Sequence, residues 1–527
     1  MTRIVIIGSG LAALSAARTL IKRGIRPLVL DCGESLPLRT QHVVERMAKM
    51  TAGQWSSEDI DLISENATIH AKNSLPRKLA FGSDYFYGNH SKVFNNTAQE
   101  NNPLPPFSLA RGGFSVGWGA SVLPAADCDI GSWPISSNEL RKYYAATLAE
   151  LPLSACDDEL SEHFPLHAAD CDSLKLTRGN AALLSAFQGK TEKLKMMQAV
   201  AGQARLLTRV SNTKTAPGCQ YCGYCMSGCV YGNIYKSSLE IDDLIKNDLL
   251  DYESGVFVNY LREKEDAVAI YFTDKTNSSH TMQAKRVFLA AGAIGSARII
   301  LQSKNVYEQS IPLLATIGFI APLLRLKKNI LDWPNMNTQP AVFLEYKVPN
   351  FSDHWVHAQI STANELALQK LGLLKNDHSL GYKLRKKAAE HLVFANCNMH
   401  SDHGVSHSIK LCKDNLLFSQ MGDTSHARQA VKLAKKRLFS VARAAGCYVL
   451  LPFVQSGLGF ASNHLGGSLP MKHHPEKETD TNILGNPKGW SKIHVLDSSV
   501  FPSIPGTTIG LLAMANAKRI VDSVEIK

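Results

Sequence analysis

The sequence predicts an α/β protein with two structural domains, one of them built on a parallel β-sheet. An apolar segment at 3–7 turns through glycines into a helical pattern, which indicates a strand–turn–helix unit. A second apolar segment, at 495–502, precedes another helical pattern near the opposite end of the chain. Because 527 residues exceed what one simple core accommodates, we expect a second domain.

The N-terminal turn, GSGLAA, fits the pattern G-x-G-x-x-G/A, with alanine in the third position. Gly8 permits the tight turn, Gly10 lets the backbone approach a pyrophosphate, and Ala13 lets the helix pack against the strand. The following helix offers N–H groups and a positive dipole end to phosphate. A second strand, at 27–30, is followed by Asp31, which is placed to bind a ribose hydroxyl. These features predict a Rossmann-like dinucleotide site.

Two further glycine-rich segments favour FAD over NAD as the dinucleotide. The segment RGGFSVGWGA at 111–120 suits close approach of the backbone to a flat ring and to phosphates. The segment AAGAIGS follows a predicted strand at 285–289. A typical NAD domain needs neither segment. The cofactor-binding candidates in them are Gly112, Gly113, Ser115, Trp118, Gly119, Ala291 and Gly292.

Four of the eleven cysteines lie close together in the sequence. Cys219, Cys222, Cys225 and Cys229 have the C-x2-C-x2-C-x3-C spacing of bacterial ferredoxins, without the proline that follows the fourth cysteine there. Such spacing puts several thiolates on one turn, as a metal site requires. One iron–sulfur cluster is the first interpretation, and unliganded structural thiols are the second. Zinc is the third, because its sites usually pair two distant C-x2-C knuckles.

These segments together give the chain a resemblance to the glucose–methanol–choline (GMC) oxidoreductases, FAD enzymes that oxidise alcohols and sugars. The resemblance covers 1–35, 111–144, 219–238, 286–301 and 462–527, and the cysteine motif is similar to that of cysteine-rich dehydrogenases in the family. It implies a discontinuous FAD-binding domain of 1–150, 206–319 and 449–527. The divergent residues, 151–205 and 320–448, are then an α+β substrate-binding domain or cap on a mostly antiparallel sheet.

The resemblance also implies a catalytic base. His464, followed by Gly467 and Ser468, stands where the family has an H-x-x-G-T/S histidine that accepts the alcohol proton. Histidine suits this task because its neutral form is available near neutral pH. The second His or Asn of the family falls at Gly506, which can neither orient a hydroxyl nor accept a proton. Thr507 or Thr508 could substitute in part, the divergent domain could supply the group, or the chemistry could differ.

The terminal segment supplies the remaining cofactor candidates. An acid at the position of Asp497 meets the ribityl chain or phosphate of the flavin in the family. Thr507 and Thr508 precede the terminal helix, whose N-terminus would stabilise negative charge on a reduced flavin.

The function that these residues imply is oxidation of a CH–OH group of a sugar, sugar derivative or alcohol. His464 would take the hydroxyl proton and flavin N5 the hydride, with an external protein or quinone receiving electrons through the cysteine segment. Without a cluster there, the enzyme could be an oxidase. Two alternatives stay open: a redox-neutral lyase or isomerase that keeps FAD, and a non-catalytic electron-carrier subunit.

Composition and charge narrow the partners. The net charge is +11, but its basic clusters at 383–387 and 432–437 have the spacing of solvated helix faces and lack interleaved aromatic residues. We therefore expect no nucleic-acid partner, whereas an anionic substrate or an anionic membrane surface would suit this charge. No signal peptide or membrane-spanning segment is predicted, and disulfides are not expected. The predicted location is the cytoplasm, with peripheral membrane contact left open.

Local patterns place further elements along the chain. Strands are predicted at 341–346 and 355–360, and 311–324 is predicted to be a buried strand pair or loop. Helices are predicted at 364–371, 427–445 and 509–524, and Ser136 with Glu139 forms a capped helix start.

Overall fold

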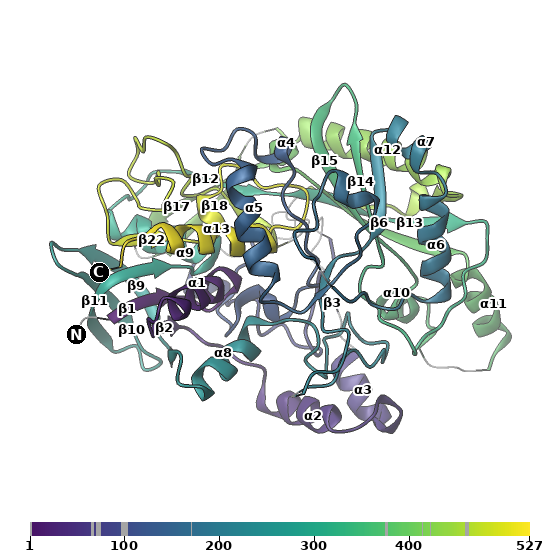
Figure 1. Cartoon of the computed structure of the whole chain (residues 1–527), viewed down its shortest axis with the longest axis horizontal. Helices are drawn as coiled ribbons and strands as arrows, with labels where there is room; N and C mark the ends of the chain where they lie inside the picture. Colours follow the sequence, from purple (N-terminus) through teal and green to yellow (C-terminus); the bar gives the residue numbers. More distant parts are fainter. Residues whose placement is uncertain are drawn as a thin grey trace.

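The computed structural model describes residues 3–64, 68–69, 75–95, 104–169, 171–214, 216–374, 378–413, 415–421, 423–458 and 463–526. Two seven-stranded sheets organise the molecule, and in Figure 1 they occupy opposite ends of its long axis. Both chain ends lie in the half that contains β1 and β22, so the two termini contribute to one sheet.

The first sheet is mainly parallel and is built from both ends of the chain. Its order is β8 (Asp251–Ser254), β2 (Leu28–Asp31), β1 (Arg3–Ile7), β11 (Ser279–Leu289), β10 (Val268–Thr273) and β9 (Phe257–Glu263), with β22 (Ile493–Val495) also pairing with β11. The parallel pairs bury continuous apolar runs such as Ile4–Ile7, as sheets covered on both faces do. Three helices lie over this sheet: α1 (Leu11–Lys22), α13 (Gly510–Ser523) and α5 (Ser137–Leu148), with α13 packed against the other two.

The second sheet is antiparallel. Its order is β19 (Cys447–Val449), β13 (Ile317–Arg325), β16 (Leu392–Met399), β15 (Ser352–Thr362), β14 (Val342–Val348) and β6 (Ala199–Gln203), with β20 (Gln455–Gly457) also pairing with β13. Helices α6 (Arg178–Gln188), α7 (Thr191–Met196) and α12 (Ser425–Ala444) pack against this sheet. Alternate residues of β14, Leu344 and Tyr346, belong to the core shared with α12, so Phe343 and Glu345 point to the opposite face.

A four-stranded sheet packs against α9 (Gly292–Ser303), in the half of the molecule that contains β22. Its order is β18 (Asn415–Met421), β17 (Ser406–Cys412), β12 (Ile311–Ala315) and β21 (Leu465–Gly466). Its register sets Ala315 opposite Leu465. The residue directly before β21 is His464, so this small sheet fixes the position of the predicted base.

Seven further α-helices and two two-stranded ladders complete the described α-helices and strands. The helices are α2 (Leu38–Ala48), α3 (Ser57–Ser64), α4 (Asp127–Ile130), α8 (Ser237–Lys246), α9 (Gly292–Ser303), α10 (Glu365–Lys370) and α11 (Leu380–Ala389), and the two-stranded ladders are β3 (Thr68–Ile69) with β4 (Arg77–Lys78) and β5 (Leu153–Ser154) with β7 (Leu206–Leu207).

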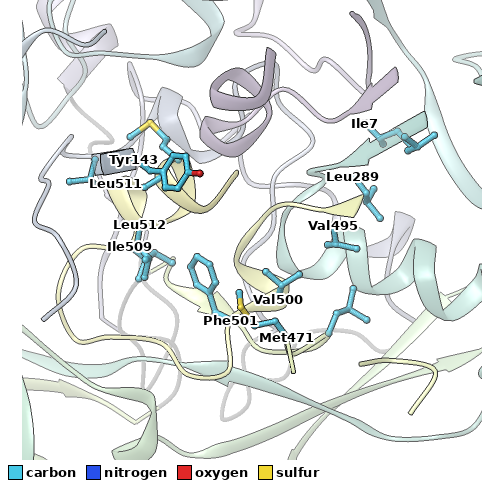
Figure 2. Close-up of a cluster of buried hydrophobic side chains, with 14 of the residues drawn as sticks. Ile7, Tyr143, Leu289, Met471, Val495, Val500, Phe501, Ile509, Leu511 and Leu512 are labelled. Carbon is cyan, nitrogen blue, oxygen red and sulfur yellow. The ribbon is translucent and has the colours of Figure 1, made fainter. Parts of the chain in front are cut away.

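The largest core holds the C-terminal segment against the first sheet. In Figure 2 the side chains of Leu289 and Val495 lie beside Ile7, while Phe501 lies between Val500 and the first residues of α13. Phe501 is fully buried and its ring centroid lies 4.9 Å from that of Trp133. Burial of one such aromatic ring contributes roughly 1.5–3 kcal/mol. This packing fixes the start of α13 relative to β1.

The structure confirms the predicted fold class, with a Rossmann-like parallel sheet and a second part on an antiparallel sheet. The strands predicted at 341–346 and 355–360 and the helices at 364–371 and 427–445 are present as β14, β15, α10 and α12. Residues 311–324 form two consecutive strands, β12 and β13, which belong to different sheets. Helix α13 begins at Gly510, so Thr507 and Thr508 precede its first turn. The predicted domain boundary at 319/320 falls inside β13, and the boundaries stay a prediction.

Among the described residues, no helix is both long and apolar enough to cross a membrane.

Gly318 gives a direct test of the antiparallel packing. A Cβ at this position would lie 2.0 Å from the carbonyl oxygen of Cys397 in the paired strand. We expect Gly318→Ala to lower the free energy of unfolding by about 1–3 kcal/mol, since the strands must separate locally. Gly53→Ala is the control, because a Cβ there would meet no atom within 4 Å. Equal urea-unfolding midpoints for both variants would contradict this packing of β13 on β16.

Candidate active site

A cavity of about 460 Å³ lies where three helices begin. Its walls include Gly10 and Leu11 at the start of α1, Gly292 at the start of α9, and Gly510 at the start of α13. The residue before each helix provides no side-chain cap, although at α9 the Asp497 carboxylate accepts from the amide of Gly292. The first N–H groups of a helix have no partner within the helix and carry a partial positive charge. The cavity is therefore suited to an anionic or strongly polar ligand.

The glycines at these helix starts leave room for a ligand. Gly8 has φ +97°, and a Cβ there would lie 2.3 Å from the carbonyl oxygen of Ala290, so this turn requires glycine. At Gly10 and at Gly292, in contrast, a Cβ would meet no protein atom within 4 Å. Both residues line the cavity, as does Ala291, so the space beside their α-carbons belongs to the cavity. The backbone here fits the pyrophosphate of a dinucleotide.

Asp31 lies at the end of β2 in the cavity wall, as predicted. Its carboxylate accepts hydrogen bonds from the hydroxyl of Ser9 and, at 2.9 Å, from that of Tyr252. Burial raises the pKa of Asp31 to about 6, while these hydrogen bonds oppose the shift. The amide of Gly112 donates to the Ser9 hydroxyl at 2.8 Å, so Ser9 joins the N-terminal turn to the second glycine segment.

The second glycine segment forms another wall. Gly113, Ser115, Trp118 and Gly119 line the cavity, whereas Gly112 and Ala13 support it from behind. Gly112 is left-handed, with φ +92°, and a Cβ there would lie 2.9 Å from the amide nitrogen of Ser238. The Trp118 indole donates to the carbonyl of Tyr235 at 2.7 Å, which fixes the ring. Ala13, near the start of α1, is fully buried, consistent with a role in packing this helix.

Asp497 also lines the cavity and orders the start of α9. Its carboxylate accepts from the amide of Gly292 at 2.9 Å and from the hydroxyl of Ser296 at 2.5 Å. Burial raises the pKa of Asp497, whereas its hydrogen bonds hold it down. A buried carboxylate with these donors positions both α9 and the turn into η7 (Ser498–Val500).

His464 lies in the cavity wall directly before β21. Burial lowers its pKa to about 4, and the charge of nearby His357 lowers it further. At neutral pH the imidazole is therefore uncharged and able to accept a proton. The structure thus brings the predicted base into one cavity with the predicted dinucleotide turn.

The antiparallel sheet contributes a polar wall beside His464. Gln359 of β15 and Asn396 of β16 are paired in register and line the cavity. The Gln359 amide donates to Nε2 of His357 at 3.1 Å, and Nδ1 of His357 donates to Glu345 at 2.5 Å. His357 and Glu345 are fully buried, and burial raises the pKa of Glu345. These hydrogen bonds, from Gln359 through His357 to Glu345, hold the Gln359 side chain in one orientation at the cavity.

The missing family residue at Gly506 has a steric explanation. A Cβ at Gly506 would lie 2.9 Å from the carbonyl oxygen of Trp355 and 3.0 Å from that of Asn398. The antiparallel sheet approaches so closely that no larger side chain fits. Thr507 and Thr508 do not line the cavity either, and the Thr508 hydroxyl accepts from the amide of Leu123 at 2.9 Å. Both residues precede α13 outside the cavity lining, and their contact with a cofactor stays a prediction.

The four predicted metal-ligating cysteines lie in one loop beside the cavity. Met226, within this loop, lines the cavity. The sulfur atoms accept hydrogen bonds from N–H groups: Cys219 from Asn337 (3.7 Å), Cys225 from Thr338 (3.4 Å), Cys229 from Asn233 (3.2 Å) and Cys222 from the backbone of Tyr224. Burial raises the pKa of Cys219, Cys222 and Cys225. In the described chain these sulfurs do not converge within 4.8 Å of one another, so they do not surround a single ion.

One other group of side chains has metal-binding chemistry. Ligand atoms of His354, His400 and Asp402 lie within 4.8 Å of one another. The two imidazole rings are parallel within 7°, with centroids 3.6 Å apart. A metal ion binds in the plane of an imidazole, and two parallel planes at this spacing share no such point. Asp129 and Asp402 instead raise the pKa of His354 to about 9 against the opposing effect of burial, which makes this group an ion-pair network.

Sequence reasoning missed several cavity residues. Arg77, Lys78 and Asn463 line the cavity, but no sequence pattern singles them out. The positions of Gln359 and Asn396 in the cavity wall follow only from the pairing of their strands. An alternating pattern predicts that a strand has two faces but not which face lies toward the cavity.

The lowered pKa of His464 is measurable by NMR. In protein with ¹⁵N-labelled histidines, the resonances lost in His464→Gln should report a neutral ring from pH 8 down to about 5, because the pKa is about 4. His354 is the internal control and should stay protonated up to about pH 8. A midpoint for His464 near the ordinary histidine value of about 6.5 would contradict its burial.

Comparison with known proteins identifies the fold and not the family. No family model matches the sequence, and no curated protein matches it. Among the solved structures that it resembles is the crystal structure of pyridoxine 4-oxidase from Mesorbium loti. The match covers 99% of this chain and 99% of that chain, with 14% sequence identity and a TM-score of 0.59. The chain therefore has the fold of this oxidase over its full length.

Proposed function

We propose that the protein is an FAD-dependent oxidoreductase that oxidises a CH–OH group. The observation that carries this proposal is the meeting of three helix starts, Asp31 and His464 in one cavity. A dinucleotide needs the first two features, and removal of a proton from a hydroxyl needs the third. The discontinuous domain of 1–150, 206–319 and 449–527 would bind FAD, and 151–205 with 320–448 would bind the substrate.

FAD is preferred to NAD because the cavity extends beyond the dinucleotide turn. The walls formed by Gly113, Trp118 and Gly119, and by Ala291 and Gly292, continue to His464. Apart from Trp118, these residues offer backbone and small side chains to a flat ring. When bound, FAD supplies the acceptor for the hydride that leaves the substrate carbon. We place Asp31 at the adenosine ribose and Gly10 and Gly292 at the phosphates and ribityl chain.

The chain itself supplies proton transfer and orientation. His464 accepts the hydroxyl proton, since its lowered pKa keeps it neutral at working pH. Gln359 and Asn396 take the orienting role left open by Gly506, because both line the cavity beside the base. Asn396 Oδ1 is buried without a hydrogen-bond partner among the described residues, so it is available to a substrate hydroxyl. The Glu345–His357 pair holds Gln359 in place.

The proposed reaction requires a substrate with a CH–OH group. Sugars, sugar derivatives and longer alcohols all carry the required CH–OH group. Pyridoxine belongs in the first set of substrates to test, because it is the substrate in the name of the structurally similar oxidase.

The test of this function is the effect of His464→Gln on reduction of the bound flavin. We expect the variant to retain flavin but to be reduced about 10²–10⁴-fold more slowly by any active alcohol, since general base catalysis is lost. His42→Gln, on the exposed side of α2, is the control. The readout is anaerobic stopped-flow absorbance, with flavin content measured in parallel.

The outcome also separates the alternatives. Equal reduction rates in wild type and His464→Gln would remove His464 from the mechanism. Turnover with transient or no net flavin reduction would favour a lyase or isomerase. Bound flavin that no alcohol reduces would favour an electron-carrier subunit.

We further propose that the cysteine loop carries one iron–sulfur cluster that passes electrons to an external protein or quinone. N–H donors to all four cysteine sulfurs support this, because such bonds stabilise the negative charge of cluster-bound thiolates. Among the described residues no three of these sulfurs lie within 4.8 Å of one another, which argues against one zinc ion. Met226 in the loop lines the cavity, so a cluster held by this loop would lie beside a flavin bound there.

Elemental analysis tests the cluster. Protein purified without oxygen should contain iron and acid-labile sulfide in stoichiometric amounts, and Cys225→Ser should lose both. Cys412→Ser, outside the loop, is the control. Flavin-containing wild type without iron or sulfide, after attempted reconstitution, would leave structural thiols and make oxygen the first acceptor to assay.

A further inference from the structure

Two basic side chains line the cavity without a role in the proposed proton transfer. Arg77 and Lys78 form strand β4, and both contribute to the cavity wall. They lie at the end of the cavity that contains His464. The hydroxyl of Tyr87 donates to the carbonyl of Lys78 at 3.2 Å, and the same hydroxyl is hydrogen-bonded to the side chain of Asn463. Asn463 precedes His464 in the chain.

Among the described residues, the hydrogen bonds of both cations go to backbone carbonyls. Nη2 of Arg77 donates to the carbonyl of Leu104 at 3.4 Å, and its guanidinium lies 5.8 Å from the ring centroid of Tyr87. Nζ of Lys78 donates to the carbonyls of Trp118 (3.3 Å) and Cys225 (3.2 Å). Within the described ranges, no carboxylate oxygen forms an ion pair with either side chain. Backbone carbonyls solvate a cation only in part, so positive charge remains at this wall.

The surroundings make this positive charge costly. Burial lowers the pKa of Arg77, and it lowers that of Lys78 to about 8. The acid whose charge interacts with Lys78 is Glu365. Burial raises the pKa of Glu365 to about 7. Glu365 already accepts from the amides of Met226 and, at 3.2 Å, Ser227. At neutral pH this carboxyl is partly protonated and does not balance two cations.

A bound anion would remove this imbalance. Charge-assisted hydrogen bonds from a guanidinium and an ammonium to anionic oxygens are stronger than bonds between neutral groups. Arg77 offers a planar pair of donors, and Lys78 has one N–H beyond the two that meet backbone carbonyls. The neighbouring amides of Gln359 and Asn396 are neutral and suit the hydroxyl-bearing part of the same molecule.

We propose that the substrate is an alcohol that also carries a carboxylate or phosphate group, which Arg77 and Lys78 bind while the hydroxyl reaches His464. This inference rests on the proposed oxidation of a CH–OH group. It adds the charge class of the substrate. The two sources of anionic oxygens, carboxylate and phosphate, make the same contacts and are separated by experiment.

Lys78 has a second neighbour that must be separated from substrate binding. The thiols of Cys225 and Cys229 interact with its charge, and Lys236 opposes it. Lys78 would thus also balance negative charge in the cysteine loop. Arg77 has no such interaction, and it is therefore the decisive residue for the test.

The experiment measures binding by calorimetry in the protein as purified, with its cofactor. The matched ligands are glycolate with glycolamide and 4-(hydroxymethyl)benzoate with 4-(hydroxymethyl)benzamide, and 2-hydroxyethyl phosphate is compared with ethylene glycol. In at least one pair we expect the anion to bind about tenfold or more tightly than its neutral partner. Preference in the phosphate pair alone identifies a phosphate ester, and preference in a carboxylate pair identifies a hydroxy acid.

In Arg77→Gln, the ratio of the affinity for the anion to the affinity for its neutral partner should fall close to one. The affinity for the neutral partner itself should not change. Arg262→Gln is the matched control, because Arg262 is an exposed arginine that also lies over a tyrosine ring, 5.5 Å from Tyr260. If Arg77→Gln does not fold, Arg77→Lys should fold and keep part of the preference. Equal affinities within every pair in wild type, or an unchanged preference in Arg77→Gln, would overturn the inference.

Failure of this inference and failure of the proposed function are distinguishable. Flavin that is present and reduced by alcohols, with no preference for anions, contradicts the substrate class alone. A preference for anions that depends on Arg77, in protein that never binds flavin, contradicts the proposed oxidation and keeps the anion site. A change in flavin reduction potential in Arg77→Gln without any change in anion affinity would assign Arg77 to the flavin and overturn the inference.

Discussion

The structure depends on one constraint: both ends of the chain contribute to the same parallel sheet. Strand β11 pairs with β1 on one side and with β22 on the other, and α13 packs between α1 and α5. The hydroxyl of Ser15 in α1 donates to the carbonyl of Met514 in α13 at 2.7 Å. Because of this closure, the start of the terminal helix and the loop with His464 face a turn that lies more than 450 residues earlier in the chain.

Buried charge follows from the same arrangement. Asp31, Asp497 and Lys78 have pKa values shifted by burial, and each faces the cavity. A protein maintains such groups where a ligand or a reaction uses them. Asp31 and Asp497 are compensated by hydroxyl and amide donors of the protein. Among the described residues, Arg77 and Lys78 donate hydrogen bonds to backbone carbonyls and form no ion pair, which is the basis of the anion site proposed above.

The sequence was most informative where local geometry demands particular residues. Gly8, Gly10 and Asp31 could be predicted because a tight strand-to-helix turn accepts few residue types. The sequence also showed that Gly506 has no large side chain. It could not show the reason, which is the nearby carbonyl of Trp355 in the antiparallel sheet. Thr507 and Thr508 were predicted at the cofactor because they directly precede α13, whereas in the structure the cavity is lined from Ile509 onward. Arg77, Gln359 and Asn396 depend on long-range packing that leaves no local pattern.

Flavin content is the direct measure of whether this cavity holds FAD. We expect about one FAD per chain in wild-type protein after purification or reconstitution. We expect little or none in Gly10→Val, whose added side chain enters the cavity and meets no protein atom at its Cβ, so that the fold is kept. Gly53→Val, where a Cβ likewise meets nothing within 4 Å, should retain the flavin. Wild-type protein that is folded and takes up no flavin, or Gly10→Val that binds it as wild type does, would contradict the account.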